Sequence, residues 1–184
     1  MAKKVISFGL NTKDINRAIK ELEQYKIEFQ KKVDTYRKRI AEEIAVNASL
    51  NFGSSQMEDI VGTIVGGKLV VGSRPRTPDV TVNVSDRGSI SVVVANGEDA
   101  VWCEFGAGVY HNGSVGSSPN PYGKDLGFTI GSYGKGLGKQ QKWGYYDENG
   151  EVVITRGTPA SMPMYNAVQE VMRKAIDIAK EVFG

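Results

Sequence analysis

The stretch Thr155-Arg-Gly-Thr-Pro-Ala-Ser-Met-Pro-Met-Tyr165 decides how this 184-residue chain ends, because it leads from an extended segment into a helical pattern. Pro163 has a fixed φ and no N–H to donate, so it suits the first turn of a helix. Thr158 or Ser161 is the predicted N-cap. Apolar residues then recur every three or four positions, which predicts one apolar helix face made of Tyr165, Val168, Met172, Ala175, Ile176 and Ala179. The rest of the chain has to supply a surface for this face.

A second, much longer helical pattern opens the chain. Asn11 or Thr12 is the predicted N-cap, and Gly and Pro are absent from Asn11 to Phe52. A long helix is predicted over 12–50. From Thr12 to about Ala48 alone it would be roughly 55 Å long at about 1.5 Å per residue, whereas a domain of this size is only about 40 Å across. The helix is therefore expected to kink, or to project and meet a partner. Its apolar stripe comprises Ile15, Ile19, Leu22, Tyr25, Phe29, Val33, Tyr36, Ile40 and Ile44. The alternative, a simple coiled coil, is disfavoured because Tyr and Phe stand where Leu or Ile is expected.

The segment 58–105 changes to the two-residue period of strands. A first hairpin is predicted around Gly66-Gly67 and a second, from 80 to 94, around Asp86-Arg87-Gly88, with a loop over 72–79 between them. Alternation places Val80, Val82 and Val84 inward, with Thr81, Asn83 and Ser85 outward. The predicted fold is a single α+β domain over 1–184, in which an antiparallel sheet of hairpins is covered by the N-terminal and C-terminal helices.

The segment 106–150 is unusual because it holds 12 of the 22 glycines and is also rich in aromatic residues. A long loop of this kind is usually functional, and we expect it to become ordered against a partner; an irregular flap on its own domain is the alternative. The segment Trp143 to Ile154 is predicted to be a hairpin turning at 148–150, and 151–184 adds a final strand and the C-terminal helix. Just before the loop, residues 98–105 are predicted to form a short helix or strand, with Glu98, Asp99 and Glu104 on a solvated face.

Charge and cysteine content point to a cytoplasmic protein that is neither secreted nor dedicated to nucleic acid. The net charge of +2 combines +4 over residues 1–50 (11 basic, 7 acidic) with −2 over the remainder (12 basic, 14 acidic). The basic helix is expected to be a solvated face, with an acidic partner as the alternative. Cys103 is the only cysteine, which favours a reducing compartment. A secretory signal and a membrane-spanning run are not recognised in the sequence, so a membrane is not an expected partner.

The sequence offers little catalytic chemistry. The glycine-rich run Gly131 to Lys139 departs from a phosphate-binding loop, because Tyr133 stands at the first glycine position and Gln140 replaces the magnesium-binding hydroxyl residue. His111 is the only histidine, so neither a serine–histidine relay nor a histidine-rich zinc site is easily assembled. The prediction is a non-enzymatic protein that has no catalytic or metal-binding residues and uses no cofactor.

Two segments resemble a known family. Val101-Trp-Cys-Glu-Phe-Gly-Ala-Gly108 is similar to the hydrophobic-x-x-Glu-Phe-Gly-Thr-Gly segment of neck, or tail-component, proteins of long-tailed bacteriophages, typified by the tenth gene product of a lambda-like coliphage. The stretch 155–165 resembles the family's Gly-x-Pro-x-Arg-Pro-Phe segment, which opens the last helix. The Trp143-Gly-Tyr-Tyr segment and the order of elements agree with it as well. Ala107, Met162 and Met164 depart from the pattern, and the missing arginine puts a salt bridge at this turn in doubt.

The resemblance implies a structural virion protein that completes the head–tail joint and is assembled in the host bacterial cytoplasm. Its implied partners are copies of itself in a ring, expected to be a hexamer, the neighbouring connector and tail-tube or tail-terminator proteins, and at most DNA passing non-specifically through the channel. A prophage-encoded module that binds a host protein is the alternative. Tyr165 is expected in the core and Met162 at an interface. The candidate structural or interface residues are Trp102, Glu104, Phe105, Gly106, Gly108, Tyr133, Trp143, Arg156, Gly157, Pro159, Met162, Pro163 and Tyr165.

Overall fold

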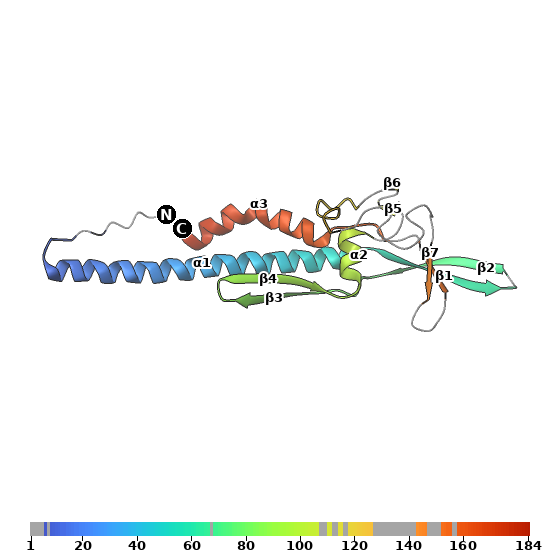
Figure 1. Ribbon diagram of the computed structural model, residues 1–184, viewed down its shortest axis with the longest axis horizontal. Coiled ribbons are helices and arrows are strands. Elements are labelled where there is room, and N and C mark those ends of the chain that lie inside the picture. Colours follow the sequence, from blue (N-terminus) through green and yellow to red (C-terminus); the bar gives the residue numbers. More distant parts are fainter. Residues whose placement is uncertain are drawn as a thin grey trace.

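The computed structural model describes residue 6 and residues 8–66, 68–106, 110–111, 114–115, 118–126, 143–146, 152–155 and 158–184. The described part is elongated, and its long axis follows one helix, α1 (Thr12–Ser54) (Figure 1). Asn11 is the N-cap of α1, and its side chain accepts a hydrogen bond from the Asp14 amide at 2.9 Å. The helix has 43 residues and is about 65 Å long at 1.5 Å per residue. The predicted start is confirmed, and the helix continues a turn beyond its predicted end.

The C-terminal helix α3 (Pro163–Phe183) runs antiparallel to α1 and covers only its C-terminal part (Figure 1). The Asn51 side-chain amide donates to the Pro163 carbonyl at one end of the contact. At the other end, the Phe183 ring lies 5.8 Å from the Phe29 ring, and Lys32 donates to the Phe183 carbonyl. Because α3 ends beside Phe29, the first part of α1 projects beyond it.

The hairpin of β3 (Thr81–Arg87) and β4 (Ile90–Asn96) packs on a different side of α1 (Figure 1). The strands are in register from Thr81↔Asn96 to Arg87↔Ile90, so the two turn residues are Gly88, with φ +61°, and Ser89. The turn therefore lies two residues later than the predicted Asp86-Arg87-Gly88. Near this turn, Asp86 pairs with Arg37 at 3.2 Å and with Lys38 at 3.1 Å, which fastens the hairpin tip to α1.

The remaining long hairpin does not join β3 and β4. Strands β1 (Met57–Val65) and β2 (Lys68–Arg76) form a four-stranded antiparallel sheet with β7 (Trp143–Tyr146) and β8 (Val152–Thr155), in the order β2-β1-β8-β7. The pairing Val65↔Lys68 confirms the predicted turn at 66–67, and β7 with β8 confirms the predicted hairpin. Pro75 lies in β2, an edge strand, where its missing N–H is tolerated. The predicted loop over 72–79 is wrong up to Arg76.

A short helix, α2 (Asp99–Phe105), lies at the C-terminal end of α1 (Figure 1). It ends at Gly106, whose φ of +79° suits glycine. The core cluster gathers here and consists of Phe52, Met57, Ala100 and Cys103, with Val80, Val82, Ala95, Trp102 and Met164 packed against it. Two further strands of two residues each, β5 (Tyr110–His111) and β6 (Ser114–Val115), pair with each other.

The α+β class with long N-terminal and C-terminal helices is confirmed, and its arrangement differs in two respects. The hairpins form separate sheets, so α3 packs on α1 and not on a common sheet. The apolar face of α3 is also rotated from the predicted one: Ala167, Val171 and Ile178 are buried. Met172 and Ile176, predicted in that face, are 63% and 69% exposed. Helical periodicity allowed both faces, and the position of α1 selects one. On β3, Val82 is half-buried as predicted, whereas Val84 near the tip is exposed.

Candidate functional site

The two segments that carry the family resemblance meet at the start of α3, and Glu104 of α2 is the residue that joins them. Its side chain accepts hydrogen bonds from the amides of Met164 at 2.8 Å and Tyr165 at 3.0 Å. The side-chain amide of Asn120 donates to the same carboxylate at 2.8 Å. First-turn amides have no partner inside their own helix, so Glu104 serves as the N-cap acceptor of α3 from another helix.

This replaces the predicted cap. The N-cap residue of α3 is Met162, in the left-handed region with φ 54°, and its thioether is a poor acceptor. Thr158 and Ser161 therefore do not cap the helix. Ser161 instead contacts α1: its hydroxyl lies 2.7 Å from the Ser55 hydroxyl, and its amide donates to the Cys103 carbonyl at 2.9 Å. The Met162 amide donates to the same carbonyl at 3.1 Å. We call the set formed by Glu104, Asn120, Cys103, Ser55, Ser161, Met162, Met164 and Tyr165 the junction.

Glu104 is only 8% exposed, and burial raises the pKa of its carboxyl above the ordinary value. The hydrogen bonds from Met164, Tyr165 and Asn120 act in the opposite direction, but burial is the larger effect. Among the described residues no Lys or Arg forms an ion pair with Glu104. The carboxylate is therefore held by dipoles, namely the α3 amides and the helix N-terminus, which favour a negative charge.

A second buried acid, Asp99, fastens the other end of α2. It is 6% exposed and forms a two-pronged pair with Arg76 of β2, in which one contact is 2.7 Å. It also accepts from the Asp79 amide at 2.9 Å, and the Arg76 hydrogen bond lowers the pKa of Asp99. Gly97 makes room for this contact: it has φ +134°, and a Cβ there would lie 2.1 Å from the Asp79 carbonyl oxygen. The prediction that Asp99 and Glu104 lie on a solvated face is wrong, because both carboxylates have partners outside α2.

Cys103 lies between these acids and is fully buried, with its Sγ 3.8 Å from the Met57 Sδ. Burial raises the pKa of its thiol to about 11. The thiol is therefore neutral near pH 7 and packs as a small apolar group, not as a nucleophile. Within the described residues, no three His, Cys, Asp or Glu side chains cluster as a metal site would require.

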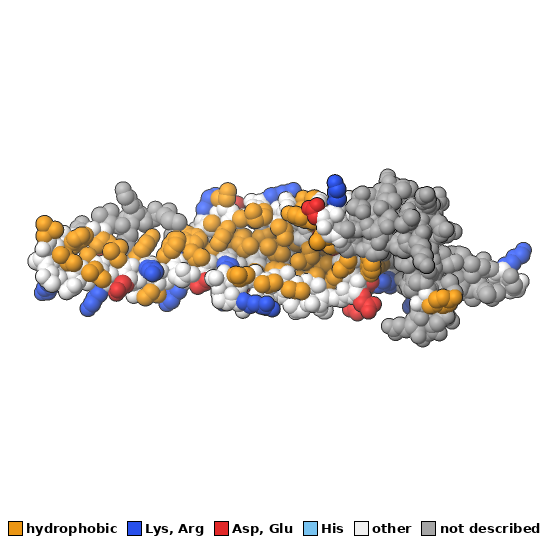
Figure 2. Space-filling view, in the orientation of Figure 1, with side chains coloured by type: hydrophobic (Ala, Val, Ile, Leu, Met, Phe, Trp, Pro, Cys, Tyr) orange, Lys and Arg blue, Asp and Glu red, His pale blue; other side chains and the backbone are white. Residues whose placement is uncertain are grey.

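An exposed apolar row lies on the projecting end of α1. Ile15, Ile19, Leu22 and Phe29 are 38%, 47%, 55% and 42% exposed. The row follows the same three- and four-residue spacing as Val33, Tyr36, Ile40 and Ile44, which are half-buried further along the helix. Figure 2 shows hydrophobic side chains as a band along α1, from its projecting end to α2, with charged side chains at the edges.

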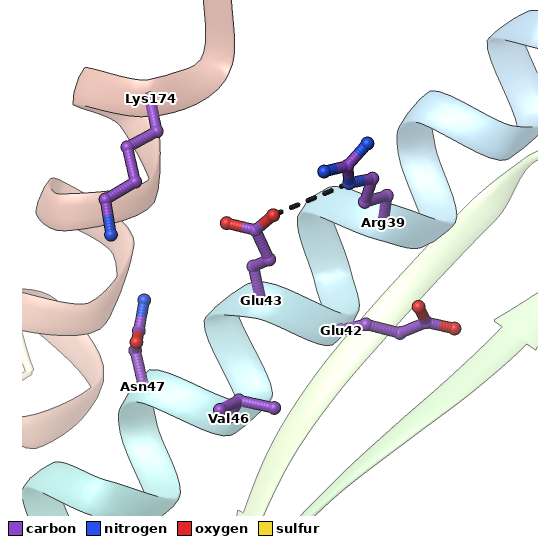
Figure 3. A pocket seen from close by; sticks show the side chains of 6 residues that line it. All are labelled: Arg39, Glu42, Glu43, Val46, Asn47 and Lys174. Atoms are coloured by element: carbon purple, nitrogen blue, oxygen red, sulfur yellow. Dashed lines mark ion pairs between the residues drawn. The ribbon is translucent and has the colours of Figure 1, made fainter. Parts of the chain in front are cut away.

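By contrast, the groove between α1 and α3 is open and charged (Figure 3). Its volume is about 300 Å³. Glu43 of α1 pairs with Arg39 at 3.6 Å and points toward the helix that carries Lys174. Lys174 itself pairs with Glu170 at 2.7 Å. Arg39, Glu43 and Lys174 are thus each paired with a residue of their own helix. The groove therefore does not have the enclosed apolar walls and converging polar groups of a small-molecule site. Its lining residues are Arg39, Glu42, Glu43, Val46, Asn47 and Lys174.

The predicted residues fall into three groups: those at or beside the junction, one that lies apart from it, and those outside the described residues. The first lies at or beside the junction and consists of Trp102, Glu104, Phe105, Gly106, Pro159, Met162, Pro163 and Tyr165. Tyr165 is half-buried and meets Tyr122 edge-on at 6.3 Å, and Met164 packs against the core cluster. Trp143 lies apart, in β7. Gly108, Tyr133, Arg156 and Gly157 lie outside the described residues, as does most of the predicted partner-binding loop.

Sequence reasoning missed Asn120, Arg76 and Asp79 as structural partners. Asn120 is 3% exposed and lies between two prolines in the Gly-rich segment. A lone Asn in the sequence Pro-Asn-Pro marks a turn, but it does not name the carboxylate that the side chain will meet. Arg76 is 23 residues before Asp99, so only the path of β2 brings the two together.

None of the described helices is long and apolar enough to cross a lipid bilayer. In comparisons with known proteins, no family model, curated protein or solved structure gives a significant match to this chain.

Proposed function

We propose that this chain is a structural component of the neck of a long-tailed bacteriophage, where it completes the joint between head connector and tail. One observation carries the proposal. The Glu-Phe-Gly segment and the Pro-turn segment, 60 residues apart, are bound to each other through Glu104 and the amides of Met164 and Tyr165. The two segments that resemble one family are thus joined in one structural unit. Such a joint is expected if both segments belong to the fold of that family.

The use of the polar groups supports a structural role over an enzymatic one. Asp99 is engaged by Arg76 and Asp79, Glu104 by the first turn of α3, and Cys103 by the core. Catalytic acids and nucleophiles have to face a substrate. In these three residues the reactive atoms face the protein.

The surfaces supply two candidate contacts for assembly. One is the apolar row of α1, and the other is the outer side of α3, where Met172 and Ile176 lie one turn apart and are exposed. A closed ring needs two different patches on each subunit. We therefore propose that the outer side of α3 contributes to a ring contact between copies, expected to be sixfold, that forms when the protein docks on the tail. Connector and tail proteins would be the neighbours, and no cofactor is required.

The test is negative-stain electron microscopy of the purified chain mixed with purified tails of the phage whose genome encodes it. The expected result is an added ring at the tail end that faces the head. Ile176→Asp should abolish the ring while the free protein keeps its helical circular dichroism. Glu170→Gln, an exposed polar change on the same helix, is the matched control and should leave the ring intact. Tails that stay bare, together with a chain that co-purifies with a host protein, would reject the neck in favour of a host-directed binding module.

A further inference from the structure

The projecting end of α1, defined here as residues 12–29, has an apolar side without a cover from α3. Ile15, Ile19 and Leu22 are between 38% and 55% exposed, and Phe29 marks the boundary because its ring contacts Phe183. An apolar row with helical spacing is typical of a surface that receives another helix. The identity of that helix follows from the charges beside the row.

The charges of the projecting end are divided between its two halves. Residues 13–20 contain three bases, Lys13, Arg17 and Lys20, and one acid, Asp14, for a net charge of +2. Residues 21–28 contain three acids, Glu21, Glu23 and Glu28, and one base, Lys26, for a net charge of −2. Two parallel copies of this segment would align like charges. Two antiparallel copies align each basic half with an acidic half.

The register agrees with the charges. If two projecting ends overlap over their whole length, residue n of one copy lies opposite residue 41 − n of the other, because 12 + 29 = 41. Ile19 then faces Leu22 of the second copy, and Lys20 lies beside its Glu21. Ile15, Ile19, Leu22, Lys26 and Phe29 follow the alternating three- and four-residue steps of a and d positions. Each pair in this overlap joins an a position to a d position, as antiparallel packing requires. Ile19 and Leu22 form the apolar pair, whereas Ile15 lies opposite Lys26 and Phe29 opposite Thr12.

Two of the aromatic residues that argue against a coiled coil, Phe29 and Tyr36, take part in the packing of α3. Phe29 and Tyr36 both contact Phe183, with ring centroids 5.8 Å and 6.0 Å away. They therefore belong to the packing of α3. The part before them contains Ile15, Ile19 and Leu22, the residue types that helix pairs favour. It also contains Tyr25, which is 43% exposed and stacks on Phe29 with ring centroids 6.3 Å apart.

We propose that residues 12–29 of α1 form an antiparallel, two-fold helix pair with the same segment of a second copy of this chain. Such a contact is isologous and closes on itself, so the free protein is a dimer. The apolar row of α1 is one of the two candidate assembly contacts named above, and the helix pair assigns it to a contact within the free dimer. The ring contact is assigned to the outer side of α3 and forms only on the tail, so the helix pair can be tested separately from the neck function.

Size-exclusion chromatography with light scattering tests the pair on the full chain. The wild type should have twice the chain mass, and Leu22→Asp should have the single-chain mass with unchanged helical circular dichroism. Ile176→Asp, an equally drastic change at an exposed site on α3, should remain dimeric. A monomeric wild type overturns the proposal, and so does a dimer that survives Leu22→Asp. Bare tails with an intact Leu22-dependent dimer would reject the neck function alone.

A charge swap tests the orientation. Lys20→Glu and Glu21→Lys, each alone, should weaken dimerisation about tenfold, because each places like charges side by side across the pair. The double variant Lys20→Glu/Glu21→Lys restores opposite charges and should recover wild-type affinity. Additive loss in the double variant overturns the antiparallel pairing.

Cysteine cross-linking gives a second readout of orientation. Chains with Ile19→Cys and chains with Leu22→Cys should cross-link to each other on oxidation when mixed, and only weakly when each is alone. Efficient cross-linking of each variant alone would show a parallel pair and overturn the proposal. The native Cys103 is fully buried and serves as the unmodified background.

Discussion

The two ends of α1 have the same apolar periodicity and opposite surroundings. At the C-terminal end, Phe52 is 2% exposed within a core made by α1, α2 and β1. At the N-terminal end, Leu22 is 55% exposed on the same helix. The difference arises because α3 is 21 residues long and α1 is 43, so α3 reaches only as far as Phe29. A regular stripe therefore indicates that a helix will be covered, but not by which chain.

The covered end also shows which α1 residues the fold buries most deeply. At this end they are the small residues Ala41, Ala45 and Ala48, together with Phe52, whereas Ile40 and Ile44 are half-buried; on the projecting end only Ala18 is buried, among the described residues. Small side chains let the β3–β4 hairpin and α3 approach the helix backbone closely.

The largest expected effect contrasts the two ends directly. Phe52→Ala should lower the free energy of unfolding by about 4 kcal/mol, because it opens a cavity in the core. Leu22→Ala should change it by less than about 0.5 kcal/mol once the dependence on protein concentration is removed. Urea unfolding at several protein concentrations measures both. Equal losses at the two positions would show that the projecting end is covered by its own chain.

The next effect concerns the junction that completes the covered end. Glu104→Ala should lower the free energy of unfolding by about 3 kcal/mol, since it leaves the amides of Met164 and Tyr165 without their acceptor. Glu104→Gln keeps one acceptor oxygen and should lose about half as much. Glu98→Ala is the control and should be nearly neutral, because Glu98 is exposed at the N-cap of α2 and its side chain makes no capping hydrogen bond. A stable Glu104→Ala variant would contradict the capping role.

A smaller loss is expected at the turn that seats α2. Gly97→Ala should lower the free energy of unfolding by about 2 kcal/mol, because the residue has φ +134° and its new Cβ would meet the Asp79 carbonyl. Gly53→Ala is the matched control: it lies inside α1 with open space at its Cβ position, and it should stabilise the protein by up to about 1 kcal/mol. Thermal unfolding monitored by circular dichroism reports both changes.

The smallest expected effect is a difference in how Asp99 and Glu104 make the free energy of unfolding depend on pH. The pKa of Asp99 is lowered from 3.8, so its stabilisation is present above that value and is lost as the pH falls through the lowered pKa. The pKa of Glu104 is raised from 4.5, so its contribution is complete below that value and is lost as the pH rises through the raised pKa. Asp99→Asn should flatten the acid side of the stability profile, and Glu104→Gln should flatten the side above 4.5.

Urea unfolding at stepped pH measures these slopes, which are expected to have opposite signs. The comparison uses the slope of each variant and not its absolute stability, because both substitutions also disturb hydrogen bonds. A Glu104→Gln variant with the same slope as the wild type above pH 4.5 would show that the Glu104 pKa is not raised.

The local parts of the fold were predictable because their signals lie within a few residues. Asn11 and Asp14 define the start of α1, Gly66 and Gly67 define one hairpin turn, and Gly106 ends α2. The burial of Asp99 and Glu104 was not predictable. An acid on a seven-residue helix resembles a surface residue until its partner is known, and here the partners are a strand 23 residues earlier and a helix 60 residues later.

By itself, the sequence determined the α+β class, the long helix and its excess length over a compact domain, because these depend on periodicity, turn residues and chain length. Tertiary structure decided which side of α3 is buried, which residue caps it, and that β8 joins β1 and not β3. Those outcomes depend on which groups meet across long separations, where several arrangements satisfy the same periodicity and only packing and the pairing of buried polar groups select one. For the apolar row of α1 that α3 leaves exposed, we propose that a second molecule supplies the packing partner.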